Sequence, residues 1–235
     1  MDSVRSIPSV LVFDVNETLL DIESMAPIFE RIFGDKRVLR VWFDQLIMYS
    51  MTVTLADQYK DFWALGVGVL QMVGSIHGVP VNLDDVEALA HGMRTMPAHA
   101  DAAEGLRQLQ AAGFRMVTLT NSTPIRGSRT PLESAGLDRF FEGQFHIDAV
   151  RAYKPTPAVY HMVAKELGVP TAACCMVAAH VWDTIGGQSA GMAGALLTRP
   201  GNAALPVPGL PQPNVMAADL PSLAAQLIRM WRASS

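Results

Sequence analysis

The chain has 235 residues, half of them hydrophobic, and a formal net charge of −4. This length suits one large domain with a smaller insertion, and the apolar content is ample for a buried core. The negative charge and the lack of a long basic run argue against nucleic-acid binding. The first residues lack the apolar centre of a signal peptide, and the longest apolar stretch, residues 62–76, is too short for a membrane span. We therefore expect a cytoplasmic protein with no membrane partner.

The first predicted element is a buried strand, Ser9 to Phe13, which runs directly into Asp14. The residues that follow, 21–97, do not alternate between strands and helices, and their pattern indicates mostly helices. We therefore predict a helical cap at residues 21–97, inserted into a core domain made of residues 1–20 and 98–235.

From residue 101 onward, strands and helices alternate regularly. The predicted helices cover residues 101–113, 124–136, 156–168, 183–191 and 220–231, and the predicted strands cover residues 114–120, 172–179, 194–198 and 214–217. Strands that are apolar throughout and alternate with helices indicate a parallel sheet covered on both faces. The predicted fold class is therefore α/β, with a Rossmann-like core. Cys174 and Cys175 are neighbours in one strand, so they point to opposite faces and are expected to fill the core.

Polar residues follow three of the predicted strands. Asp14 comes directly after the first strand, Thr120 and Asn121 stand at the end of the second, and residues 178–183 follow a third. Ligands of parallel sheets bind at the carboxyl ends of the strands. We therefore expect these polar residues to form one site at that edge of the sheet.

Four segments in this order resemble the haloacid dehalogenase superfamily: FDVNETLLD, VTLTNST, AYKPTPAVY and MVAAHVWD. The resemblance covers essentially the whole chain, including the position of the cap, and is strongest to the L-2-haloacid dehalogenases. It implies a hydrolase that removes halide from short 2-haloacids, such as haloacetates and 2-halopropionates. It also implies that the enzyme uses no cofactor and no metal ion, and that it forms a homodimer.

The resemblance further implies a role for each matched residue. Asp14 would be the nucleophile that displaces halide and forms an ester, which water then hydrolyses. Lys154 would keep the carboxylate of Asp14 charged, and Asp183 would pair with Lys154 and orient the water. Asp183 could also be the N-cap of the following helix. The other matched positions would hold the nucleophile or the substrate: Thr18, Thr120, Asn121 and Tyr160.

The chain departs from the family pattern in the helical cap and after the nucleophile. The family has Tyr-Gly where this chain has Asn16 and Glu17, and the family's cap arginine, which follows a tryptophan, is replaced by Phe43 after Trp42. Arg40 is the candidate that would replace this arginine in binding halide or carboxylate. Asn16 and Phe43 are further candidates for the substrate pocket. The alternative is that the substrate is bound by different groups.

His180 stands where the family has asparagine, and alanines replace the two serines before it. A histidine here could donate a hydrogen bond to the departing halide or act as a base on the hydrolytic water. Fluoride is the strongest hydrogen-bond acceptor among the halides, so defluorination of small acids such as fluoroacetate is a hypothesis to test. A purely structural role for His180 stays open as well.

Two other functions compete with this hypothesis. Magnesium-dependent phosphatases of the same superfamily carry a second aspartate two residues after the nucleophile, where this chain has Asn16. A hard cation prefers several anionic oxygen ligands, and the last loop offers only Asp183, so the sequence disfavours this activity. The third candidate is a non-catalytic relative that binds a small acid or a protein. The intact set of Asp14, Lys154 and Asp183 argues against it.

Overall fold

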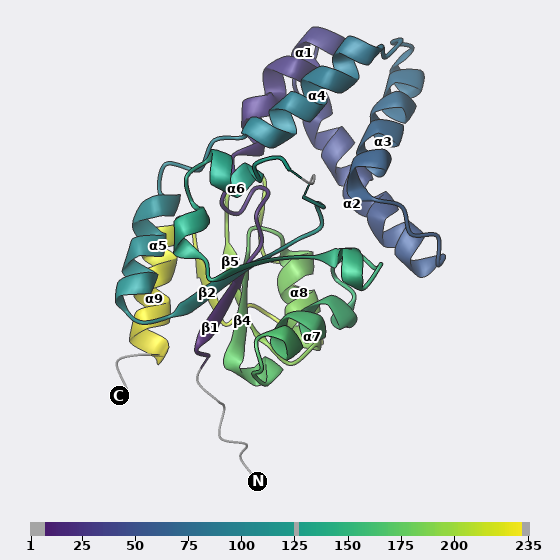
Figure 1. Ribbon diagram of the computed structural model, residues 1–235. Helices are drawn as coiled ribbons and strands as arrows, with labels where there is room; N and C mark the ends of the chain where they lie inside the picture. The colour runs from purple at the N-terminus through teal and green to yellow at the C-terminus, as the bar shows by residue number, and fades with distance from the viewer. Residues whose placement is uncertain (1–7, 125–126, 232–235) are drawn as a thin grey trace.

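The computed structural model describes residues 8–124 and 127–231 (Figure 1). Residues 1–7, which were expected to lack a signal peptide, lie outside these ranges. So do residues 125–126 of the helix predicted for residues 124–136. Within them, no helix is both long enough and apolar enough to cross a lipid bilayer.

A parallel sheet of six strands, in the order β3-β2-β1-β4-β5-β6, forms the centre of the described structure. Its strands are β1 (Val10–Phe13), β2 (Arg115–Thr120), β3 (Gly143–His146), β4 (Cys174–Ala178), β5 (Ala193–Leu197) and β6 (Val215–Ala217). β1 lies between β2 and β4, and Phe13 pairs with Thr118 and Val177. The predicted α/β class with a parallel sheet is confirmed. Cys174 and Cys175 are buried and free, as expected for core side chains.

β3 was not predicted from the sequence. This strand, Gly-Gln-Phe-His, pairs with β2 and forms one edge of the sheet. An edge strand has a neighbour on one side only and is less buried, so it does not need the continuous apolar run that marked the other strands. The five predicted strands agree with the structure to within two residues at each end.

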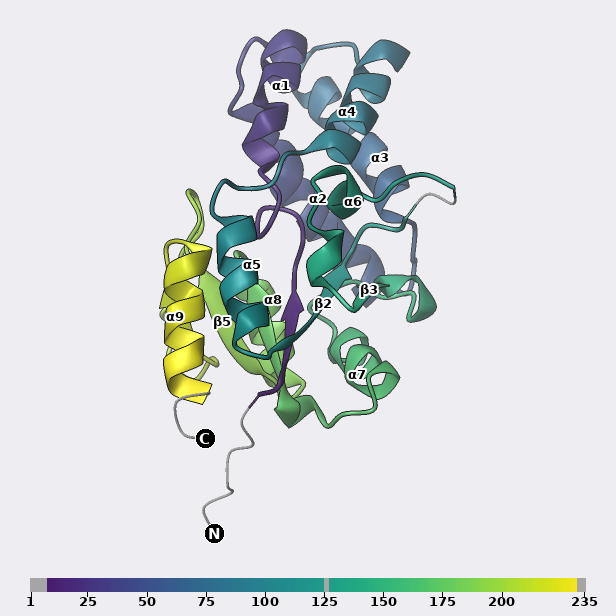
Figure 2. The same cartoon turned by 60° about the vertical axis from the view of Figure 1, so that its left-hand side comes forward.

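Helices cover both faces of the sheet. Two helices, α5 (Ala102–Ala111) and α9 (Leu220–Trp231), pack side by side on one face, whereas α7 (Pro157–Glu166) and α8 (Val181–Ser189) cover the other (Figures 1 and 2). The helix expected over residues 124–136 is reduced to α6 (Pro131–Ser134), which begins after Thr130. Short 3-10 turns complete the core: η2 (Asp138–Phe140), η3 (Ile147–Ala149) and η4 (Thr171–Ala173).

A second group of helices lies beyond the carboxyl ends of the strands (Figure 1). It consists of η1 (Ile22–Met25), α1 (Ala26–Phe33), α2 (Val38–Leu55), α3 (Phe62–His77) and α4 (Leu83–Thr95), and is called the helical segment below. The chain enters and leaves it side by side, because Leu20 forms an antiparallel bridge with Ala98. Inside it, Trp42 joins α2 to α3, since its buried indole Nε1 donates to the carbonyl oxygen of Gly66 at 2.9 Å.

Candidate active site

Asp14 is held at the carboxyl end of β1. The strand before it is fully buried, and Asp14 itself is only 5% exposed. Its backbone N–H donates to the carbonyl oxygen of Val177 on β4 at 3.0 Å. Thr18 Oγ1 donates to Asp14 Oδ2 at 2.7 Å and accepts from the backbone N–H of Ala179 at 2.9 Å. Thr18 thus connects the nucleophile candidate to the loop after β4.

Lys154 lies between two carboxylates and is buried. Its Nζ donates to Asp14 Oδ1 at 2.8 Å, to Asp183 Oδ2 at 2.7 Å and to the carbonyl oxygen of Leu119 at 2.9 Å. The three protons of the ammonium group therefore all have acceptors. The side chain of Asn121 accepts from the backbone N–H of Lys154 at 3.2 Å. The side chain of Asn121 thus holds the segment that carries Lys154.

These contacts decide the charges of the cluster. Burial on its own would raise the pKa of Asp14, but Lys154 and His180 outweigh it and hold the pKa of Asp14 well below its ordinary value. Burial opposes the charge of Lys154, but Asp14 and Asp183 raise its pKa. For Asp183, burial outweighs Lys154, and the pKa of this carboxyl is raised. At neutral pH, Asp14 is therefore an anion beside a buried cation.

Asp183 lies in the first turn of α8 and is not its N-cap, which is His180. Its Oδ1 accepts a hydrogen bond from the Tyr160 hydroxyl at 2.6 Å. Burial and the adjacent Asp183 raise the pKa of Tyr160 well above its ordinary value, so the hydroxyl keeps its proton. Tyr160 is fully buried behind Asp183. In this structure it therefore contacts Asp183 and not Asp14.

His180 lies beside Asp14 and is almost fully buried. Its Nε2 donates to Glu17 Oε2 at 2.7 Å, and its Nδ1 lies 3.4 Å from Asp14 Oδ2. The ring stacks on Trp182 with centroids 4.9 Å apart and contacts Phe43 at 5.7 Å. Burial opposes protonation of His180, but Asp14 and Glu17 outweigh it and raise its pKa to about 9. His180 is therefore an imidazolium at neutral pH.

Glu17 is a site residue for which the sequence predicted no catalytic or substrate-binding role. It has a left-handed backbone conformation with φ of 63° and is 4% exposed. Its carboxylate binds His180 and Arg40, and Asn202 Nδ2 donates to Oε1 at 3.2 Å. One feature of the sequence could have pointed to Glu17. Glu17 and His180 both depart from the family pattern, and their side chains contact each other in the structure.

Arg40 forms ion pairs with two carboxylates of the chain. Its guanidinium forms an ion pair with Glu17, and its Nε donates to Glu23 Oε1 at 2.6 Å. Both partners are carboxylates of the chain itself, and Glu17 lies between Arg40 and His180. The structure therefore does not bring Arg40 to Asp14, but places it at the smaller cavity that His180 also lines.

Two cavities are lined by residues near the nucleophile candidate in the chain or in space. The larger, about 520 Å³, is mostly apolar and lies between the helical segment and the sheet. Its lining includes Asn16 and Thr120 from the core, Trp42 and Leu46 from α2, Phe62 from α3 and Arg94 from α4. The smaller, about 380 Å³, is more polar and is lined by Glu17, Arg40, Phe43, Asp44, Ile47, His180, Trp182, Gly201 and Asn202. Asn16 and Thr120 thus line one cavity, and Phe43 and His180 line the other.

In the described ranges, no group of three or more His, Cys, Asp or Glu side chains is arranged to hold a metal ion. What the site does provide is an ionised carboxylate held by a buried ammonium group, a second carboxyl fixed by a tyrosine, and an imidazolium. Such a set can perform nucleophilic attack by Asp14 followed by reactions of the covalent product.

Comparisons with known proteins identify the family of the chain. The model of the haloacid dehalogenase-like hydrolases matches residues 8–191. (S)-2-haloacid dehalogenase 4A of Burkholderia cepacia is 29% identical over 204 residues, which cover 86% of each chain. (S)-2-haloacid dehalogenase 1 of Pseudomonas sp. strain CBS-3 is 30% identical over 194 residues, covering 81% of this chain and 82% of the relative. A solved structure of an L-2-haloacid dehalogenase superposes with a TM-score of 0.86 at 28% identity, covering 94% of this chain and 99% of the other.

Proposed function

Because the chain belongs to the haloacid dehalogenase-like hydrolase family, we propose that it hydrolyses the carbon–halogen bond of 2-haloacids, with Asp14 as the nucleophile. The observation that carries the proposal is the buried carboxylate of Asp14, which Thr18 and Lys154 hold at the carboxyl end of β1. The relatives named above support the reaction class.

In the first step, a carboxylate oxygen of Asp14 attacks the carbon that bears the halogen. The new C–O bond forms as the C–halogen bond breaks, halide leaves with the bonding electrons, and Asp14 becomes a neutral ester. Lys154 and Thr18 fix the carboxylate before the attack, which lowers the entropic cost of reaching the reacting geometry. Splitting the displacement into two steps is the advantage of covalent catalysis.

In the second step, water attacks the carboxyl carbon of the Asp14 ester. Negative charge then develops on an oxygen of Asp14, where the Lys154 ammonium group stabilises it. Asp183 holds Lys154 in place, and Tyr160 holds Asp183. The product is a 2-hydroxyacid, and the carboxylate of Asp14 is restored.

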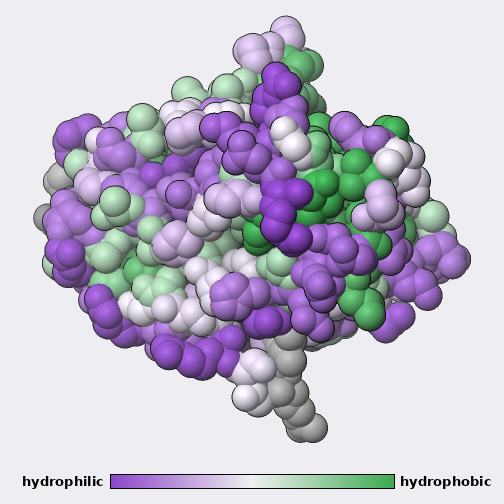
Figure 3. Space-filling model, turned by 90° about the horizontal axis from the view of Figure 1, so that it is seen from above, coloured by the Kyte–Doolittle hydropathy of each residue, from purple (hydrophilic) through white to green (hydrophobic). Residues whose placement is uncertain are grey.

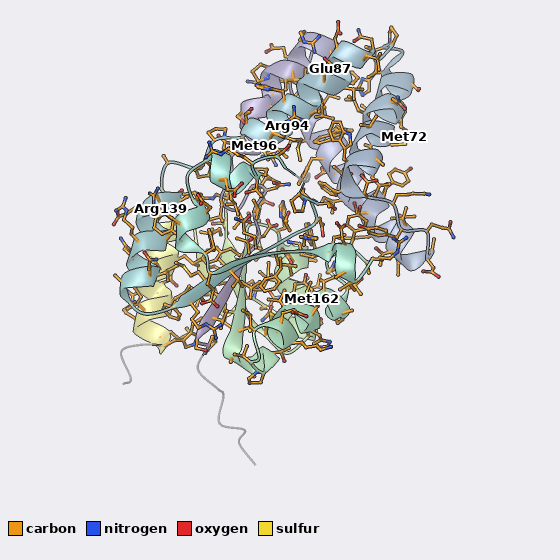
Figure 4. All side chains as sticks on the ribbon, in the orientation of Figure 1. Met72, Glu87, Arg94, Met96, Arg139 and Met162 are labelled. Carbon is orange, nitrogen blue, oxygen red and sulfur yellow. The ribbon has the colours of Figure 1, made fainter. Side chains whose placement is uncertain are left out.

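The larger cavity holds the carbon chain of the substrate in this proposal. Its volume of about 520 Å³ lies within the usual range of small-molecule sites, roughly 300–1,000 Å³. It exceeds what haloacetate or 2-halopropionate needs, so acids with larger apolar groups on the halogen-bearing carbon also fit. Arg94 on α4 lies where the helical segment meets the core (Figure 4) and supplies a positive charge for the substrate carboxylate. In this role it replaces the cap arginine that the family pattern places after Trp42.

The helical segment acts as the cap of this site, and we propose residues 21–97 as its limits. Support comes from the larger cavity, whose lining residues belong to both the helices and the sheet. The Leu20–Ala98 bridge also supports these limits, because there the segments that enter and leave the helices lie side by side. A substrate enclosed there is separated from bulk water.

A homodimer is a further part of the proposal. Val41, Met48 and Leu55 follow one another at intervals of seven on α2 and are 45%, 45% and 89% exposed. This spacing places them on one face of the helix. Figure 3 shows hydrophobic residues gathered in one part of the surface seen from above, beside hydrophilic ones. A second copy of the chain is the expected occupant, and light scattering of Met48→Lys against the wild type tests it.

Halide release tests the proposed reaction. The purified protein is incubated, with a chelator present, with chloroacetate, fluoroacetate and each enantiomer of 2-chloropropionate, and Asp14→Asn serves as the control. We expect repeated release by the wild type and none by the variant. A single turnover in ¹⁸O-labelled water should place the label in Asp14.

The opposite outcomes separate the alternatives. If the protein releases no halide but releases phosphate from phosphate esters only when Mg²⁺ is present, the phosphatase is favoured. Absence of both activities would favour a relative that only binds a small acid or a protein. Fluoride release from fluoroacetate would extend the reaction to defluorination.

A further inference from the structure

Glu17 and His180 form a buried ion pair that the two steps above do not use. His180 Nε2 and Glu17 Oε2 are 2.7 Å apart, and the two residues are 6% and 4% exposed. Glu17 has a left-handed backbone conformation, and Arg40 and Asn202 hold its other carboxylate oxygen. A pair this constrained has a defined orientation before any substrate binds.

The second ring nitrogen of His180 is directed at the nucleophile. Nδ1 is buried, has no hydrogen-bond partner within the described part of the chain, and lies 3.4 Å from Asp14 Oδ2. The charge of this nitrogen is therefore balanced by the ion pair with Asp14, because no other polar group of the described residues binds it. The group that it faces is the carboxyl of Asp14, which becomes the ester.

The direction of the displacement distinguishes between the two roles that the sequence left open for His180. A halide leaves on the side of the carbon opposite the attacking oxygen, and therefore away from Asp14. His180 Nδ1 lies on the Asp14 side, next to the carboxylate oxygen itself. It is thus badly placed to bind the halide and well placed to reach a water molecule that attacks the carboxyl carbon.

We infer that Glu17 and His180 act as a general-base pair in the hydrolysis of the Asp14 ester, with His180 as the base and Glu17 as its positioning residue. This inference rests on the proposed dehalogenase function. The smaller, polar cavity of about 380 Å³ is lined by both side chains and is the route by which the water arrives.

The charges change in the required direction during the cycle. Before the reaction, the anions Asp14 and Glu17 both face His180, whereas Asp44 and Arg40 lie farther around the same cavity. Formation of the ester removes the charge of Asp14. The imidazolium then loses one of its two close anions and releases its Nδ1 proton to solvent through the smaller cavity.

The neutral ring then carries its remaining proton on Nε2, bound to Glu17, and a lone pair on Nδ1. Nδ1 takes a proton from water as the water oxygen bonds to the carboxyl carbon of Asp14. The tetrahedral intermediate collapses, the hydroxyacid oxygen leaves and takes the proton of the new carboxyl group, and Asp14 and His180 return to their charged forms. The net products are hydroxyacid, halide and the one proton released earlier.

Rapid-quench kinetics with (S)-2-chloropropionate tests this assignment in Glu17→Gln and His180→Phe. The phenylalanine keeps a ring against Trp182 and Phe43 but has no nitrogen. Glu23→Gln is the matched control, because Glu23 also binds Arg40 but does not contact His180. General acid–base catalysis typically contributes about 10²–10⁴-fold. We therefore expect a burst of one halide per site near the wild-type rate in both variants, followed by turnover that is at least about tenfold slower.

Intact-protein mass spectrometry should then show the Asp14 ester accumulating in both variants and not in Glu23→Gln. In the wild type, the rate of ester hydrolysis should rise with pH as His180 loses its proton. In Glu17→Gln this ionisation should move to lower pH, because the anion close to His180 is gone. Loss of the burst, or wild-type hydrolysis in His180→Phe, would overturn the inference. A wild type that releases no halide at all would instead refute the dehalogenase proposal, and this inference with it.

Discussion

Asp14 and Lys154 lie 140 residues apart in the chain, and the Lys154 ammonium group donates to Asp14 Oδ1 at 2.8 Å where both side chains are buried. Asp183 binds the same ammonium group at 2.7 Å. Two carboxyls therefore depend on one cation. The charge of the nucleophile is thus a property of the tertiary structure, and the cluster should respond strongly to any change in its members.

Removal of that cation should damage both stability and activity. Lys154→Met leaves two buried carboxyls facing each other, and breaking a buried ion pair by removing one partner costs about 3–5 kcal/mol. The pKa of Asp14 should rise and halide release should stop. Denaturant unfolding and halide assays measure the two effects. Lys165→Met, at an exposed lysine on α7, should change the free energy of unfolding by no more than about 0.5 kcal/mol. Equal effects of the two variants would contradict the buried role of Lys154.

The hydroxyl of Tyr160 should be sensitive to a methyl group at Gly186. A Cβ there would lie 2.5 Å from the Tyr160 hydroxyl oxygen and 2.6 Å from Pro155 Cβ. Gly186→Ala should therefore cost about 1–3 kcal/mol, displace Tyr160 from Asp183 and lower the rate of halide release. Gly68→Ala, in helix α3, meets no atom within 4 Å and should be neutral or stabilising by up to about 1 kcal/mol. Thermal denaturation of both variants distinguishes crowding from helix propensity.

The pH dependence of stability should carry the signature of His180. Its pKa is raised from 6.5 to about 9 in the folded protein, so its stabilising contribution is complete below pH 6.5 and is lost as the pH rises towards 9. Between pH 6.5 and 8.5 the free energy of unfolding should fall by about 2 kcal/mol, since each unit of pH corresponds to about 1.4 kcal/mol per proton. The same titration of His180→Phe should be flatter. If the free energy of unfolding falls equally with pH in the wild type and in His180→Phe, His180 is not the cause of the pH dependence.

The larger cavity should determine which chain lengths are accepted. Ala90 on α4 lines it, so Ala90→Trp should reduce kcat/KM for 2-bromohexanoate by at least about tenfold and leave chloroacetate much less affected. Glu87→Trp places the same side chain at an exposed position of the same helix (Figure 4) and serves as the control. A uniform loss for all acids in Ala90→Trp would indicate general damage instead of a blocked cavity.

Arg94 should contribute to substrate binding through its charge. A hydrogen bond to a charged group is worth about 1.5–3 kcal/mol, so Arg94→Gln should raise KM roughly 10- to 100-fold. Arg107→Gln removes an exposed arginine of α5 that pairs with Glu104, and its KM should match that of the wild type. If KM stays unchanged in Arg94→Gln, another group binds the carboxylate.

Local patterns in the sequence were enough to predict most of the sheet and the position of its reactive edge. The buried run before Asp14 predicted β1, and continuous apolar stretches predicted four further strands. These predictions succeeded because a strand buried on both faces must be apolar along its whole length. β3 escaped because an edge strand does not meet that condition. The start of α8 at Val181, which places Asp183 inside the helix, also lay beyond what the pattern showed.

Side-chain partners between distant segments were decided by the tertiary structure alone. The sequence left open whether Arg40 replaces the missing arginine, and folding places Glu17 and Glu23 around it. Tyr160 matched a site position, yet it is buried behind Asp183. Glu17 and His180 are 163 residues apart. Periodicity and motifs report which residues are apolar or reactive along the chain, whereas ion pairs and cavities depend on how separate elements pack, which no local pattern contains.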